Sequence, residues 1–200
     1  MVENGALILV LVWVDDCFTA WKGLDLYNRF NEHCGKSFTM KDLGPVSFAL
    51  GMRVQRDRKR RIIYLDQQAF CDEILTSFDN VMQNCKPYPT PQVEKQYLTK
   101  AEEGFVADPE MHNSYRSLIG KVLYLQRGSR PDIANSVREL SRFLSNPNGD
   151  HWIAAKRVLR YLRGTSHYRL ALGGDMKLYP YSDADWANSQ SRRSITGMLL

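Results

Sequence analysis

An apolar run that ends in two adjacent aspartates constrains the fold of this chain more than any other feature. Residues 7–14 consist of leucine, isoleucine, valine and tryptophan, a composition typical of a buried strand. Asp15 and Asp16 interrupt the run, and an extended apolar pattern resumes over residues 17–21. Because buried strands do not tolerate adjacent charges, the pattern predicts a hairpin with both carboxylates at its tip.

The two carboxylates at this tip have two explanations. Two-metal phosphoryl transfer needs carboxylates fixed on a rigid scaffold, and a tight turn between buried strands supplies one. Aspartate is also common in ordinary solvated turns. The dipeptide alone does not decide between a metal site and a solvated turn.

The rest of the chain alternates between helical and extended patterns. Prolines at 87, 89, 91 and 109 and weak periodicity predict an extended linker over residues 84–112. Apolar spacing predicts helices over residues 24–34, 67–78, 115–125, 137–144 and 150–162. It predicts strands over residues 48–55, 61–65, 168–172, 178–182 and 194–200, the first two forming a second hairpin with a charged tip at 56–60.

Charge is distributed unevenly along the chain. The net charge is +5, with 27 Lys and Arg against 22 Asp and Glu. Residues 113–200 hold 14 of these basic residues and 6 of the acidic ones, so the second half is strongly basic and suits a polyanionic partner. No apolar stretch is long enough for a membrane span and no secretory leader is recognisable, so we expect neither a membrane contact nor secretion.

A series of short motifs resembles the copia-type LTR retrotransposon Pol polyprotein. Trp13-Val14-Asp15-Asp16 is similar to the Tyr-x-Asp-Asp box of reverse transcriptases, with Trp13 in the Tyr position. The order and spacing of the later motifs agree with that family over nearly the whole chain. These motifs are residues 38–44, 48–52, 115–125, 130–133, 141–147, 151–165 and 181–187.

The resemblance implies roles for the first group of residues. Asp15 would be a catalytic ligand of Mg²⁺ or Mn²⁺, with Asp16 beside it. Lys41 would lie near the incoming nucleotide. Leu50, Gly51 and Met52 would form the primer grip, which holds the primer end near the metals.

The resemblance also implies a second metal site. Asp183 would be the first carboxylate and metal ligand of an RNase H site. Asp185 follows on the same strand face, where a solvated charge is the ordinary explanation.

Two basic clusters have competing explanations. Lys156, Arg160 and Arg163 share one side of a predicted helix, where they can follow a phosphate backbone or face solvent. Residues 56–61 resemble a nuclear-localisation run, but their place at a hairpin tip also suits a solvated turn.

The fold that we predict is α+β. Residues 1–83 would be the C-terminal part of a reverse-transcriptase palm, with two β-hairpins and a helix, and residues 84–112 a linker. Residues 113–166 would be a helical thumb and connection, and residues 167–200 the N-terminal strands of an RNase H-like domain. The implied partners are an RNA/DNA template–primer duplex and the rest of the Pol polyprotein. The implied location is a cytoplasmic virus-like particle, with the nucleus as a second compartment.

Both active sites are expected to be incomplete. The family uses a further metal-binding Asp that would precede Met1, and the other RNase H carboxylates would follow Leu200. We therefore predict that the isolated chain neither polymerises nor cleaves nucleic acid. Two alternatives stay open: a non-catalytic nucleic-acid-binding remnant, and a pseudogene product that does not fold stably.

Overall fold

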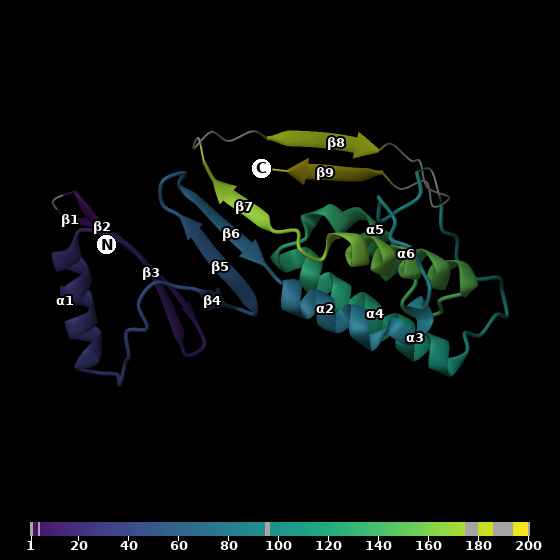
Figure 1. Cartoon of the computed structure of the whole chain (residues 1–200), viewed down its shortest axis with the longest axis horizontal. Coiled ribbons are helices and arrows are strands. Elements are labelled where there is room, and N and C mark those ends of the chain that lie inside the picture. The colour runs from purple at the N-terminus through teal and green to yellow at the C-terminus, as the bar shows by residue number, and fades with distance from the viewer. Residues whose placement is uncertain (1, 4, 95–96, 175–179, 186–193, 200) are drawn as a thin grey trace. The chain divides into compact units, whose positions relative to one another are not determined.

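The computed structural model describes residues 2–3, 5–94, 97–174, 180–185 and 194–199. The chain forms two compact units, residues 1–47 and residues 48–200 (Figure 1). The mixture of helices and small sheets agrees with the predicted α+β class. Among the described residues, no helix combines the length and hydrophobicity that crossing a bilayer requires.

The first unit is a small antiparallel sheet with one helix. Its elements are β1 (Val2–Glu3), β2 (Ala6–Trp13), β3 (Asp16–Lys22) and α1 (Leu24–Gly35). The sheet order is β1-β2-β3, so the predicted hairpin and the helix after it are both confirmed. Ile8 of β2 and Leu26 of α1 are buried, which fixes the helix against the sheet.

The second unit contains a four-stranded antiparallel sheet in the order β4-β5-β6-β7. Its strands are β4 (Phe48–Ala49), β5 (Met52–Asp57), β6 (Ile62–Asp66) and β7 (Leu170–Gly173). The prediction of one strand over residues 48–55 is wrong, because the chain turns at Leu50–Gly51 and Ala49 pairs with Met52. Residues 62–65 pair with residues 170–173, so β7 joins the sheet of the second hairpin.

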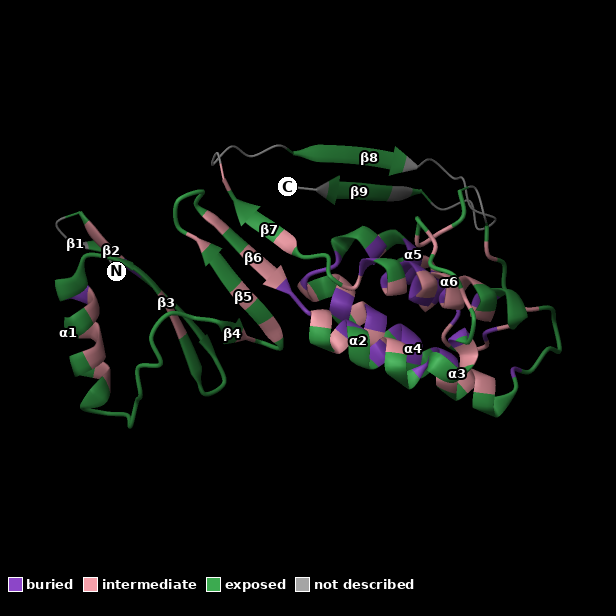
Figure 2. Cartoon of the chain, in the orientation of Figure 1, coloured by how far each residue is buried: buried purple, intermediate pink, exposed green. Residues whose placement is uncertain are grey.

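Helices hold the main hydrophobic core of the second unit. They are α2 (Gln68–Ser77), α3 (Asp79–Met82), α4 (Pro109–Gly128), η1 (Pro131–Ile133), α5 (Ala134–Ser141) and α6 (Gly149–Thr165). The helical patterns predicted for residues 67–78, 137–144 and 150–162 are confirmed within three residues at each end. The pattern predicted for residues 115–125 lies inside α4, which begins at Pro109 and so takes in the last residues of the predicted linker. Buried residues concentrate in α2, α4, α5 and α6, whereas the strands are mostly exposed (Figure 2).

A buried arginine joins α4, η1 and α6. The Arg130 side chain is 3% exposed and its Nη2 lies 2.7 Å from Oδ2 of Asp132. The same guanidinium donates to the backbone oxygen and hydroxyl of Thr165, at 2.9 and 2.7 Å. The Tyr161 hydroxyl donates to Asp132 at 2.8 Å. A buried charge needs such a full set of partners, so this cluster fixes how the helices meet.

The last strands form a separate two-stranded sheet of β8 (Tyr181–Asp185) and β9 (Ile195–Leu199). Asp183 pairs with Gly197 in the antiparallel register. The extended character predicted for this end of the chain is therefore confirmed where the structure describes it.

Candidate functional site

The Asp15–Asp16 pair lies at the tip of the first hairpin, with Asp15 in the two-residue turn and Asp16 as the first residue of β3. Trp13 pairs with Asp16, so only Val14 and Asp15 lie between the strands. Val14 has a φ of +52°, a conformation that a β-branched residue adopts only under strain. Both carboxylates are exposed. The turn thus presents two adjacent carboxylates to the surroundings on a constrained backbone.

The chemistry of these two groups suits a magnesium ion. Magnesium prefers oxygen ligands and is commonly held by one or two protein carboxylates together with substrate phosphates and water. Asp15 and Asp16 supply such carboxylates. In the part of the chain that the structure describes, no group of three or more His, Cys, Asp or Glu side chains is placed to hold a metal. A complete two-metal site therefore needs ligands in addition to this pair.

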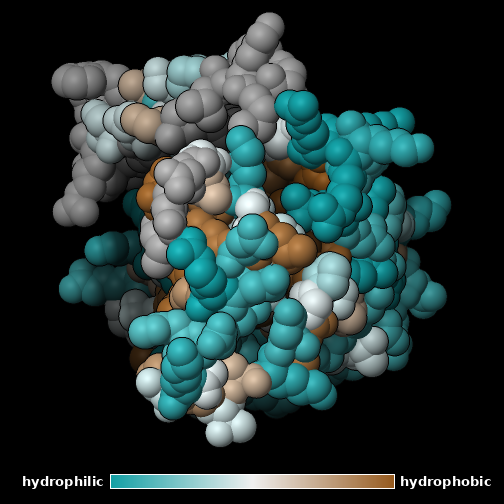
Figure 3. All heavy atoms as spheres, turned by 90° about the vertical axis from the view of Figure 1, so that its left-hand side faces the viewer, coloured by the Kyte–Doolittle hydropathy of each residue, from teal (hydrophilic) through white to brown (hydrophobic). Residues whose placement is uncertain are grey.

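The strands that carry the turn expose large hydrophobic side chains. Leu9, Leu11 and Trp13 are each 58% exposed, and Val12 is 62% exposed. Hydrophobic side chains reach the surface among the hydrophilic ones on the face shown in Figure 3. Leu9, Leu11 and Trp13 alternate along β2 and therefore lie on one face of the strand, and an exposed apolar row of this kind is typical of contact regions.

Lys41 lies in a loop that Asp42 ties to α1. The Tyr27 hydroxyl donates to one oxygen of Asp42 at 2.8 Å, and the Gly44 backbone N–H donates to the other at 2.7 Å. The Gly44 bond first, and the Tyr27 bond next, lower the pKa of Asp42. Tyr27 in turn stacks on Trp21 with ring centroids 4.9 Å apart. Lys41 itself is exposed, so it projects from an anchored loop.

The anchoring role of Asp42 was not predicted from the sequence. The available signal is the spacing Asp-Leu-Gly at residues 42–44, in which an Asp side chain accepts from the backbone two residues later. The partner on α1 is 15 residues away, and no local pattern indicates it.

Leu50 and Gly51 form the second tight turn of interest, and Met52 is the first residue of β5 after it. Leu50 and Gly51 have φ values of +51° and +73°, the arrangement of a type I′ hairpin turn. The Tyr124 hydroxyl of α4 donates to the backbone oxygen of Leu50 at 2.9 Å. A side chain at residue 51 would collide with that hydroxyl. Glycine is therefore required at this position by both conformation and space.

The basic residues of α6 hold the segment that precedes α4. Arg160 donates to the backbone oxygen of Lys86 at 2.7 Å and lies over the ring of Tyr88, 3.7 Å from its centroid. Arg163 donates to the backbone oxygens of Met82 and Cys85 and pairs with Asp79 at 2.9 Å. Lys156 has no hydrogen bond or ion pair with other described residues. Contact with a phosphate backbone stays a prediction for these three residues, and two of them already have protein partners.

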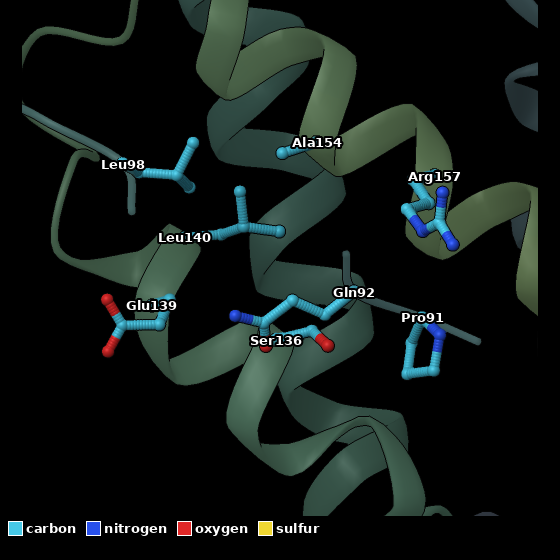
Figure 4. Close-up of a pocket in the computed structure, with 8 residues that line it drawn as sticks. All are labelled: Pro91, Gln92, Leu98, Ser136, Glu139, Leu140, Ala154 and Arg157. Carbon is cyan, nitrogen blue, oxygen red and sulfur yellow. The ribbon is translucent and has the colours of Figure 1, made fainter. Parts of the chain in front are cut away.

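A small pocket lies where the predicted linker crosses α5 and α6. Figure 4 shows Leu98, Leu140 and Ala154 together with polar groups of both helices around it. Its volume is about 20 Å³, which is enough for roughly one water molecule. The pocket cannot hold a nucleotide.

Asp183 lies on β8 and is exposed. Its strand is described, but the side chain of Asp185 lies outside the described residues. The structure therefore places the predicted RNase H carboxylate on a strand, and among the residues described it belongs to no group of three or more potential metal ligands.

Comparison with known proteins identifies the family. Residues 2–94 match the family model described as "Reverse transcriptase (RNA-dependent DNA polymerase)". The retrovirus-related Pol polyprotein from transposon TNT 1-94 of Nicotiana tabacum is 40% identical over 99% of this chain and 15% of its own length. The polyprotein from transposon RE2 of Arabidopsis thaliana is 32% identical over 91% of this chain and 12% of its own length.

A shorter relative is covered more completely. An uncharacterized mitochondrial protein of Arabidopsis thaliana is 32% identical over 94% of this chain and 76% of its own length. No solved structure gives a significant match. The chain spans less than a sixth of the two polyproteins. It belongs to the reverse transcriptase family, with Pol polyproteins of copia-type retrotransposons as its homologues over most of its length.

Proposed function

We propose that this chain is the part of a retrotransposon polymerase that carries the metal-binding turn and the primer-grip hairpin. One observation carries the proposal: two adjacent carboxylates lie at a strained hairpin tip, Asp15 in the two-residue turn and Asp16 as the first residue of β3, inside the region that matches the reverse transcriptase family. The family match supports common ancestry, and the turn supplies the carboxylates that a metal-dependent polymerase needs.

In this proposal Asp15 and Asp16 would hold Mg²⁺ or Mn²⁺, and the ion would supply electrostatic stabilisation for nucleotidyl transfer. The carboxylates hold their position because the turn leaves them little backbone freedom. Lys41 approaches the phosphates of the incoming nucleotide from its anchored loop. The turn at Leu50–Gly51 holds the primer end.

The domain assignment is part of the same proposal. Residues 1–83 are palm, 84–112 linker, 113–166 thumb and connection, and 167–200 the start of an RNase H-like domain with Asp183 as its first metal ligand. The partners are a template–primer duplex and the remainder of the polyprotein, in a cytoplasmic particle. Among the described residues no group of three or more potential ligands is placed to hold a metal, which supports the proposal that the isolated chain neither polymerises nor cleaves nucleic acid.

Manganese binding to the purified chain tests the metal-binding part. Electron paramagnetic resonance measures the free ion during a titration of the wild type, Asp15→Asn and Asp72→Asn. Asp72 is an exposed carboxylate on α2 and serves as the matched control. The proposal predicts that Asp15→Asn weakens binding at least about tenfold, as expected when a charged ligand is lost. Equal affinity of wild type and Asp15→Asn would argue against a metal site at this turn.

A non-catalytic nucleic-acid-binding role is the second candidate. It is favoured by the basic second half of the chain and by Arg116 and Arg127, which are exposed on α4. Binding would depend steeply on salt. It would also be indifferent to Asp15→Asn, which distinguishes it from the polymerase proposal.

A further inference from the structure

We propose that Tyr124 is a positioning residue that sets the conformation of the Leu50–Gly51 turn and, through it, the seat of the primer terminus. This inference rests on the proposed function, because it takes the turn to be the primer grip. It assigns a role to a side chain on α4, more than 70 residues further along the chain.

The turn has a backbone that the local sequence disfavours. Leu50 adopts a φ of +51°, which costs an ordinary L-residue free energy that the surroundings must offset. The hydrogen bond from Tyr124 to the Leu50 oxygen offers that compensation. The same hydroxyl occupies the space in which a Cβ of residue 51 would lie. Tyr124 therefore fixes both central residues of the turn.

Tyr124 is itself held by the helical core. Its ring meets the edge of Phe70 on α2, with centroids 5.2 Å apart and planes at 86°. The neighbouring residues Val122 and Leu125 of α4 are fully buried. The turn is thus connected to the core through one aromatic pair, and its position follows the position of α4.

The ring of Tyr124 also remains accessible. The residue is 46% exposed, so one side contacts the turn and Phe70 while the other faces outward. An exposed aromatic ring beside a turn is a suitable surface for a terminal base or sugar. The hydroxyl holds the turn beside this ring. Its loss should therefore alter how a primer end is recognised, beyond any effect on folding.

Recognition of a recessed 3′ end by the full chain tests this inference. Two DNA duplexes of equal length and equal overhang are compared by fluorescence anisotropy at low salt. One has a recessed 3′ end, and the other has a recessed 5′ end. Wild type should bind the recessed 3′ end more tightly. Tyr124→Phe should reduce that preference by a factor of about five, which is what losing one neutral hydrogen bond implies.

Two further variants make the result interpretable. Tyr97→Phe is the matched control, since Tyr97 is 53% exposed and makes no hydrogen bond with other described residues. Phe70→Leu removes the edge contact that holds the Tyr124 ring, and it should reduce the same preference without removing the hydroxyl. It also keeps the inference testable if Tyr124→Phe folds poorly.

The outcomes separate the inference from the proposed function. If wild type binds neither duplex, or binds both equally, the assignment of the turn as primer grip is overturned and the inference with it. If wild type prefers the recessed 3′ end and both Tyr124→Phe and Phe70→Leu keep the full preference, only the role of Tyr124 is overturned.

Discussion

Replacing Asp132 by Asn should destabilise the second unit strongly, because it leaves the buried guanidinium of Arg130 without its counter-charge. The Arg130 side chain is 3% exposed and that of Asp132 is 33% exposed. Removing one partner of a buried ion pair costs about 3–5 kcal/mol. Solvent screens the exposed third of Asp132, so we expect a loss of about 2–3 kcal/mol in the free energy of unfolding.

Thermal unfolding followed by far-ultraviolet circular dichroism measures this loss, because α2 to α6 dominate the helical signal. For a chain of this size, a loss of about 2–3 kcal/mol lowers Tm by about 4–12 °C. Asp72→Asn is the control, since this exposed carboxylate has no ion pair within the described residues. A change smaller than about 0.5 kcal/mol, the range of ordinary surface substitutions, would show that the fold does not depend on this counter-charge.

The pH dependence provides a second check on the same pair. Burial alone would raise the pKa of Asp132, but the hydrogen bonds and charge of Arg130, with the Tyr161 hydroxyl, hold it below its ordinary value of 3.8. Because the pKa of Asp132 is lower in the folded state than in the unfolded state, the ionised carboxylate stabilises the fold fully above the unfolded-state pKa. The stabilisation is lost as pH falls through the folded-state pKa. The gap between wild type and Asp132→Asn should therefore be full at neutral pH and shrink below pH 3.8.

Three further changes probe other parts of the structure. Val14→Gly should stabilise the first hairpin by about 0.5–1 kcal/mol, because glycine adopts a positive φ without the strain of a β-branched residue and the entropic cost of glycine is smaller than that gain. Chemical denaturation measures this gain, and a destabilised hairpin would contradict the presence of backbone strain at Val14. Gly51→Ala should lower the free energy of unfolding by about 1–3 kcal/mol, because the new Cβ meets the Tyr124 hydroxyl. The same denaturation curves measure this loss, and an unchanged free energy of unfolding would contradict the close approach of the hydroxyl to residue 51. Burial lowers the pKa of His151, against the opposing effects of its hydrogen bond to Thr99 and the charge of Asp150, so the fold should lose stability as pH falls below 6.5. His151→Gln should flatten that dependence between pH 5 and 7, at about 1.4 kcal/mol per pH unit at most.

Much of the fold could be predicted from local patterns. The apolar run broken by Asp15–Asp16 has a single compact solution, a hairpin, and the structure contains it. The helices of the second unit follow from apolar residues at helical spacing, because each helix must bury one face. These predictions succeed where the determining interactions lie within a few residues of each other.

The failures concern interactions between distant residues. Residues 48–55 look like one strand because a single glycine is the only turn-forming residue among them. The turn at Leu50–Gly51 is held by Tyr124, which is 74 residues away. The pairing of β6 with β7 joins segments more than 100 residues apart, which no local pattern specifies.

The basic residues of α6 show a different limit of sequence reasoning. A stripe of Lys156, Arg160 and Arg163 looks the same whether its partner is a phosphate backbone or a protein carbonyl. The structure gives Arg160 and Arg163 backbone oxygens of the preceding segment as partners. A proline-rich segment forms few regular backbone hydrogen bonds, so its carbonyl oxygens need donors from other parts of the chain. This need for donors was the sequence signal that the arginines of α6 could have protein partners.

Primer extension by a chimeric polymerase tests whether the Asp15–Asp16 turn is a metal site. This chain replaces the matching segment of the tobacco TNT 1-94 polyprotein, to which it is 40% identical over 99% of its length, and primer extension is measured with magnesium beside the unaltered parent. We expect extension by the chimera and its loss in Asp15→Asn, with Asp72→Asn unaffected. Extension that continues unchanged in Asp15→Asn would contradict the assignment of this turn as the metal site.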